Sequence, residues 1–131
     1  MLKQIKIIAN GICKGFKGAG GWSATMVYKK IAKTFNGNDK ATTTHRINLT
    51  AICEALRHMK EPCEITIETN SLYIYNAIAN GWVERWAKND WMRNKYNKAK
   101  NADLWAEYMK LSKIHKIHIT CPNAPALAAG A

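Results

Sequence analysis

The stretch Glu64-Ile65-Thr66-Ile67-Glu68-Thr69-Asn70-Ser71-Leu72-Tyr73 decides the fold. Apolar and polar residues alternate strictly over 64–69, which predicts a β-strand with one buried face and one polar face. Ser71 is a suitable N-cap for a helix over Leu72–Ala79, and Asn80-Gly81 is a helix stop signal. A strand therefore leads directly into a helix, as in α/β domains.

The region before this unit predicts three strands, of which the second and third form a hairpin. We expect these strands at Leu2–Ala9, Trp22–Tyr28 and Ile31–Phe35. The glycine-rich run 15–21 is typical of a turn, and Lys29-Lys30 separates the two strands of the hairpin.

A long helix is predicted between the hairpin and the strand at 64–69. After a polar loop at 36–41, the triplet Thr42-Thr43-Thr44 offers a hydroxyl N-cap. Apolar residues then recur at helical spacing from Ile47 to Met59, and we expect the helix to end before Pro62.

The C-terminal part of the chain predicts one more helix and one more strand. Trp82–Lys100 combines tryptophans and basic residues with little periodicity. Beyond it, Ala102–Lys113 has the apolar spacing of a helix, and His115–Cys121 is expected to be a short fifth strand. We expect one domain over residues 1–121, followed by a tail at 122–131 with weak or no structure.

The charge balance indicates a polyanionic partner. Twenty Lys and Arg against nine Asp and Glu leave a formal charge of +11 in 131 residues. This excess favours nucleic acid over charge that serves solubility alone, with an anionic membrane surface as the alternative. No segment reaches the roughly 18 apolar residues of a membrane span, and none resembles a secretory signal, so we expect a cytoplasmic protein without a membrane partner.

The cysteines and histidines predict no metal site. The cysteines include no C-x-x-C pair, and we expect reduced, mostly buried thiols; they are Cys13, Cys53, Cys63 and Cys121. The histidines show no ligand spacing and are expected to be ordinary surface or strand residues; they are His45, His58, His115 and His118.

Several short motifs carry a family likeness. They are Met1-Leu2-Lys3-Gln4-Ile5, Asn10-Gly11-x-Cys13-x-Gly15, Gly18-x-Gly20-Gly21-Trp22, Lys33-Thr34-Phe35, Thr42-Thr43-x-x-Arg46, Thr69-Asn70-Ser71-x-Tyr73 and Asn101-x-Asp103-Leu104-Trp105. In this order and spacing, over roughly residues 1–120, the chain resembles bacterial ribonuclease H of type 1. The resemblance implies an α/β fold with a five-stranded mixed sheet, three antiparallel strands first, flanked by helices. It also implies an enzyme that hydrolyses the RNA strand of an RNA/DNA hybrid with two Mg²⁺ or Mn²⁺ ions.

The same resemblance locates four metal-binding acids, and none of them is found in this chain. Three of the positions are occupied by Asn10, Asn48 and Asn70. The fourth acid, a mobile histidine and the final helix follow the fifth strand in the family, where this chain ends without them. Neutral amides hold Mg²⁺ poorly, and paired dications need clustered negative charge. The sequence therefore predicts a pseudoenzyme with no catalytic residues and no metal cofactor.

Two local alternatives remain open at these positions. Asn10 and Asn70 could satisfy turn backbone, as asparagine often does. Glu68 shares a strand face with Asn70 and could donate a replacement oxygen, although a solvated strand residue is the simpler interpretation.

The basic, tryptophan-bearing segment is the predicted binding site for an RNA/DNA hybrid or duplex. Cations displace counterions from phosphate, and aromatic faces stack on bases. The candidate binding residues are Thr43, Trp82, Arg85, Trp86, Lys88, Trp91, Arg93, Lys95, Lys98, Lys100 and Asn101. Trp82 and Trp86 could equally be helix core, whereas Trp91 is expected to be exposed.

Two other functions compete with binding alone. One is a residual or active hybrid ribonuclease with an unrecognised metal arrangement. The other is a scaffold or inhibitor that binds a protein, because a missing final helix would leave apolar sheet surface for a partner or a second copy of the chain.

Overall fold

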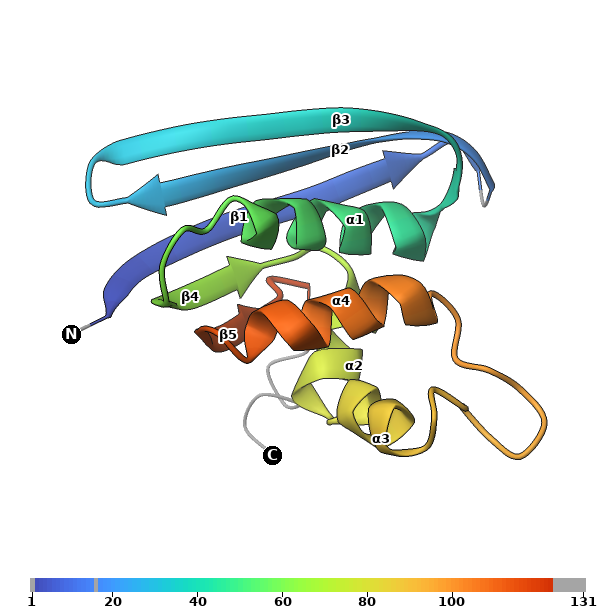
Figure 1. The fold of residues 1–131 in the computed structure, drawn as a ribbon. Helices are drawn as coiled ribbons and strands as arrows, with labels where there is room; N and C mark the ends of the chain where they lie inside the picture. Colours follow the sequence, from blue (N-terminus) through green and yellow to red (C-terminus); the bar gives the residue numbers. More distant parts are fainter. Residues whose placement is uncertain (1, 16, 124–131) are drawn as a thin grey trace.

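A five-stranded mixed sheet forms the centre of the molecule, and the computed structural model describes residues 2–15 and 17–123 of it (Figure 1). The sheet order is β3-β2-β1-β4-β5. Strands β1, β2 and β3 pair antiparallel, and β4 and β5 run parallel to β1. Their bounds are Lys3–Cys13, Lys17–Tyr28, Ile31–Thr43, Cys63–Glu68 and Lys116–Thr120. The predicted fold class is confirmed.

Helices α1 and α4 lie together on one face of this sheet (Figure 1). The four helices are α1 (Thr44–Arg57), α2 (Leu72–Ala79), α3 (Trp82–Lys88) and α4 (Ala102–Ser112). The apolar face of α1 and the inward residues of β1 and β4 form the core, including Ile7, Ile52, Leu56, Ile65 and Ile67, each at most 1% exposed. Burial of this surface is the main force that fixes α1 on the sheet.

Hydroxyl caps begin two of the helices, as the sequence predicts. The Thr43 hydroxyl accepts from the Arg46 backbone N–H at 3.3 Å, and the Ser71 hydroxyl accepts from the Ile74 N–H at 3.2 Å. Both caps satisfy donors that a helix N-terminus would otherwise leave unpaired. They fix the starts of α1 and α2, which lie beside the candidate site.

The first three strands are longer than predicted. The turn that was predicted at 15–21 is confined to the residues around Gly15 (φ +69°). The other glycines of that run belong to β2. The expected loop at 36–41 belongs to β3, where Gly37 pairs with Trp22. A side chain at residue 37 would meet the Trp22 indole, so glycine here makes room for the ring. Cross-strand pairing thus overrides the low strand propensity of glycine and asparagine.

The sheet face opposite α1 is polar where the structure describes it. Lys6 pairs with Glu68 at 3.6 Å, His118 lies 2.8 Å from Glu64, and the Thr25 and Thr34 hydroxyls are hydrogen-bonded across β2 and β3. The expectation of an apolar surface on this face is wrong, because the outward positions of β1, β4 and β5 alternate with the core positions and are mostly polar. The described residues of this face therefore give no support to self-association.

The chain end beyond β5 is described only in part. Asn123 donates from its side-chain amide to the Asn70 carbonyl at 3.1 Å, so this residue lies beside the loop that follows β4. The rest of the predicted tail, 124–131, lies outside the described residues. None of the helices in the described ranges is long and apolar enough to cross a membrane.

Candidate nucleic-acid interface

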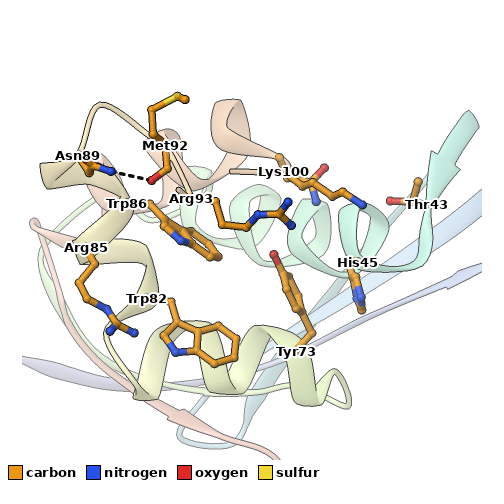
Figure 2. Close-up of a pocket in the computed structure, with 11 residues that line it drawn as sticks. Thr43, His45, Tyr73, Trp82, Arg85, Trp86, Asn89, Met92, Arg93 and Lys100 are labelled. Carbon is orange, nitrogen blue, oxygen red and sulfur yellow. Dashed lines mark hydrogen bonds between the residues drawn. The ribbon is translucent and has the colours of Figure 1, made fainter. Parts of the chain in front are cut away.

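A groove of about 1020 Å³ opens between the start of α1, helices α2 and α3, and the segment 89–101 (Figure 2). It is lined by Thr43, His45, Tyr73, Trp82, Arg85, Trp86, Asn89, Met92, Arg93, Lys100 and Asn101, and is called the groove below. Its lining contains three permanent cations and no acidic residue. Throughout the described part of the chain, Arg85, Arg93 and Lys100 form no ion pair. The groove therefore presents uncompensated positive charge.

Tryptophans from α3 line the groove and also extend the core. The rings of Trp82 and Trp86 lie 6.4 Å apart, and Trp86 meets Trp105 edge-on at 6.4 Å. Trp105 is fully buried, so its contact with Trp86 anchors the groove lining to the core. The helix-core interpretation of the tryptophan pair therefore holds, because both rings pack against the core, and their contact role stays a prediction.

His45 and Tyr73 stack on each other at the other end of the groove, with centroids 4.1 Å apart and planes 20° apart. Desolvation lowers the pKa of His45, and the nearby Lys100 charge lowers it further. Burial raises the pKa of Tyr73, whose hydroxyl points toward Arg93 in Figure 2. At neutral pH the pair therefore offers an uncharged aromatic surface bordered by cations.

The segment 89–100 folds back on itself and presents Arg93 and Lys100. Asn89 donates from its side chain to the Met92 carbonyl at 3.2 Å, and Arg93 N–H donates to the Asn97 carbonyl at 2.8 Å. Trp91 is half-buried against the core, so the expectation that it is exposed is wrong. Its backbone N–H donates to the Trp86 carbonyl on α3, and its carbonyl accepts from the Ala99 N–H, so the residue is held between α3 and the end of the segment.

Arg46 joins the starts of helices α1 and α4 beside the groove. Arg46 on α1 forms a two-pronged pair with Asp103 on α4, with N–O distances of 2.9 and 2.6 Å, and also donates to Asn101 Oδ1 at 3.3 Å. Arg46 lowers the pKa of Asp103 to about 2, so the pair stays charged at any working pH. Because Asn101 lines the groove, Arg46 positions it there.

The structure brings together most of the residues that the sequence singled out. Lining the groove are Thr43, Trp82, Arg85, Trp86, Arg93, Lys100 and Asn101, whereas Lys88, Trp91, Lys95 and Lys98 lie outside it. His45, Tyr73, Asn89 and Met92 also line the groove and were not among the candidates. His45 and Tyr73 come from two helices far apart in sequence, and no local pattern indicates their contact.

The three amides form a second cluster, here called the amide centre: Asn10 on β1, Asn48 on α1 and Asn70 after β4. Asn10 Oδ1 accepts from the Asn70 backbone N–H at 2.8 Å. Asn48, 5% exposed, accepts from the Gly11 N–H and donates to the Thr44 carbonyl, both at 2.8 Å. The local alternative of backbone satisfaction thus holds for Asn10, whereas no hydrogen bond of the Asn70 side chain is found among the described residues. Asn48, to which the alternative was not applied, also bonds to backbone groups.

The donor set of the amide centre does not fit a pair of magnesium ions. Its side-chain oxygens are neutral, and those of Asn10 and Asn48 already accept backbone N–H groups. Glu68, the nearby strand carboxylate, pairs with Lys6 instead. Within residues 2–15 and 17–123 no three His, Cys, Asp or Glu side chains are grouped to hold a metal. Two dications close together require carboxylate charge that this cluster does not supply.

A family model described as RNase H matches residues 3–124. The chain belongs to the ribonuclease H family. Its curated relatives include Ribonuclease H of Caldicellulosiruptor saccharolyticus, 40% identical over 116 residues, which are 88% of this chain and 80% of the relative. Ribonuclease H of Chlorobium chlorochromatii is 40% identical over 117 residues, 89% of this chain and 80% of the relative.

Solved structures of the family share the fold. LC9-RNase H1, described as a type 1 RNase H with the type 2 active-site motif, superposes with a TM-score of 0.79 at 23% identity, over 95% of this chain and 65% of that one. LC11-RNase H1 in complex with RNA/DNA hybrid gives a TM-score of 0.68 at 13% identity, over 90% of this chain and 86% of that one.

The prediction that this ribonuclease H-family chain is not an enzyme is wrong. Relatives about 40% identical over most of the chain are named Ribonuclease H, which points to an enzyme. That prediction rested on the amides at residues 10, 48 and 70 and on the missing fourth acid. The identity to these relatives extends over 116 and 117 residues, which is far more of the chain than those positions.

Proposed function

We propose that this chain binds RNA/DNA hybrids in the groove, as a type 1 ribonuclease H in which amides occupy the positions of metal-binding acids. The observation that carries the proposal is a groove lined by aromatic rings and unpaired cations, without an acidic residue. The relative LC11-RNase H1, whose structure is a complex with RNA/DNA hybrid, supports this choice of ligand.

The groove combines the two interactions that nucleic-acid strands need. Arg85, Arg93 and Lys100 would meet phosphates and release condensed counterions, which is a gain in entropy. The faces of Trp82 and Tyr73 would stack on sugars or bases without preference for sequence. The remaining basic residues of the segment, Lys88, Lys95 and Lys98, extend the positive field that attracts a polyanion.

Cleavage of the bound hybrid is the second candidate function, and the name of the relatives favours it. Since the amide centre does not fit paired magnesium ions, cleavage would depend on other metal-binding groups. Binding and cleavage are therefore measured on the same preparation.

The test compares charge reversal inside and outside the groove. Arg93→Glu places an acid in the groove, and Lys33→Glu makes a similar change at an exposed position of β3. With a fluorescent RNA/DNA hybrid, we expect Arg93→Glu to weaken binding by about tenfold or more and Lys33→Glu by about twofold. Equal effects of the two changes would refute the groove as the binding site.

Cleavage is followed in parallel with an end-labelled RNA strand, in Mg²⁺ and in Mn²⁺. Products formed by the wild type and reduced by Arg93→Glu support the second function. Products that are equal in both proteins identify a contaminating nuclease.

A further inference from the structure

The amide centre offers hydrogen-bond donors where a metal site would offer acceptors. Asn10 uses its oxygen to accept from Asn70, so its side-chain NH₂ group is left to donate. Asn70 is exposed, and among the described residues no hydrogen bond involves its side chain. Asn48 differs from both, because its oxygen and its NH₂ group each have a backbone partner.

We propose that the NH₂ groups of Asn10 and Asn70 bind a phosphodiester oxygen of the nucleic acid directly, without a divalent cation. The inference rests on the proposed function, because it assigns a second contact to the nucleic-acid strand that the proposed function places in the groove. Hydrogen bonds to a charged acceptor are stronger than those between neutral groups, which suits an amide donor facing phosphate.

The charges around the amide centre allow an anion to approach. Carboxylates at residues 10 and 70 would repel phosphate unless cations intervened, whereas the amides do not. The neighbouring acid on the same strand face is Glu68, and Lys6 lies 3.6 Å from it, which offsets its charge.

The position of the amide centre fits a nucleic-acid strand that leaves the groove at the His45–Tyr73 end. Asn48 lies three residues after His45 on α1, and Asn70 lies three residues before Tyr73 at the start of α2. The stacked pair therefore joins α1 and α2 close to Asn48 and Asn70, and Asn10 is bonded to the Asn70 N–H. In this proposal, a sugar–phosphate backbone that passes over the stack would next meet Asn70 and the Asn10 bonded to it.

The double substitution Asn10→Asp and Asn70→Asp tests the proposal with nearly unchanged shape. Aspartate at residue 10 keeps an oxygen that can accept the Asn70 N–H, removes the NH₂ donor and adds a negative charge. Asn36→Asp with Asn38→Asp is the matched control, because it makes the same charge change on exposed residues of β3.

Hybrid affinity is measured in EDTA and in MgCl₂ at equal ionic strength. We expect the wild type to bind equally in both solutions and the Asn10/Asn70 variant to bind about tenfold more weakly in EDTA, with recovery in Mg²⁺. The Asn36/Asn38 control should change little in either solution.

Two results would overturn the inference: an Asn10/Asn70 variant that binds in EDTA as the control does, or a wild type that needs Mg²⁺ to bind. If Arg93→Glu weakens binding while the Asn10/Asn70 variant does not, the groove proposal stands and only this inference fails. If the wild type binds no hybrid at all, the proposed function itself fails. Should the double variant not fold, as judged by circular dichroism, Asn70→Asp alone at its exposed position gives the same test.

Discussion

His45 and His115 are single residues whose environments disfavour their charged forms. The pKa of His45 is lowered by desolvation and by Lys100, and the pKa of His115 is lowered by burial. His115 Nδ1 also accepts the Cys63 backbone N–H at 3.0 Å, a bond that requires an unprotonated nitrogen. Folding therefore competes with protonation at both rings.

This predicts that the free energy of unfolding falls on mild acidification. A lowered folded-state pKa means that the unfolded chain binds these protons first, so the stability is present above about pH 6.5 and is lost as the pH falls from there through the lowered pKa values of the folded rings. Urea unfolding of the wild type at about pH 7.5 and about pH 5.5 measures the loss. Asp103, with a pKa of about 2, remains charged throughout that window.

The variant His45→Gln with His115→Gln removes both groups and serves as the comparison. Its unfolding free energy should depend less on pH over the same window than that of the wild type. Identical pH dependence in the two proteins would show that these histidines are not the cause.

Among the elements, β1 and α1 lie in close contact at Gly11. A Cβ at residue 11 would lie 2.8 Å from the Ile47 carbonyl carbon and its Cγ2, both on α1. The Gly11 N–H also donates to Asn48 Oδ1, so this contact carries the amide centre. The glycine is needed for space rather than for backbone freedom.

Gly11→Ala should therefore destabilise the protein by about 1–3 kcal/mol, because α1 must move away from the sheet. Gly21→Ala on β2 is the control, since its added Cβ would meet the end of the Asn38 side chain, which can move aside. Urea unfolding of both variants checks the prediction. A smaller loss for Gly11→Ala than for Gly21→Ala would contradict the close approach of β1 and α1.

The elements that the sequence predicted well are those with local signals. The caps Thr43 and Ser71 and the alternating strand β4 stand where expected, because hydroxyl caps and strict alternation act over a few residues. The ends of β2 and β3 were missed, since their glycines and asparagines become strand only through cross-strand pairs such as Ser23 with Asn36.

The candidate site was likewise predicted where the sequence signal is local and missed where it depends on tertiary packing. The cations and tryptophans of the groove were predicted because they are concentrated in one segment of sequence. His45 and Tyr73 were missed as a pair because their stacking depends on how α1 and α2 pack, which no local spacing reveals. The half-buried position of Trp91 likewise depends on its packing against the core.

For the molecule as a whole, charge is distributed unevenly over the surface. Six of the nine acids form ion pairs, and none of their partners is a groove cation; the paired acids are Glu54, Glu61, Glu64, Glu68, Asp103 and Glu107. On the sheet face opposite α1, Glu64 and Glu68 offset basic side chains, whereas the lining of the groove contains cations and no acid. In the proposed function, this asymmetry would orient a polyanion toward the groove before contact.

The salt dependence of hybrid binding tests the central claim most directly. Each phosphate contact contributes about −0.9 to the slope of log Kobs against log salt concentration. Arg93→Ala with Lys100→Ala should make the slope shallower by about 2, whereas Lys30→Ala with Lys33→Ala, on and after the β2–β3 turn, should leave it nearly unchanged. A slope that is the same for the wild type and the groove variant would contradict the claim that the groove binds the phosphate backbone.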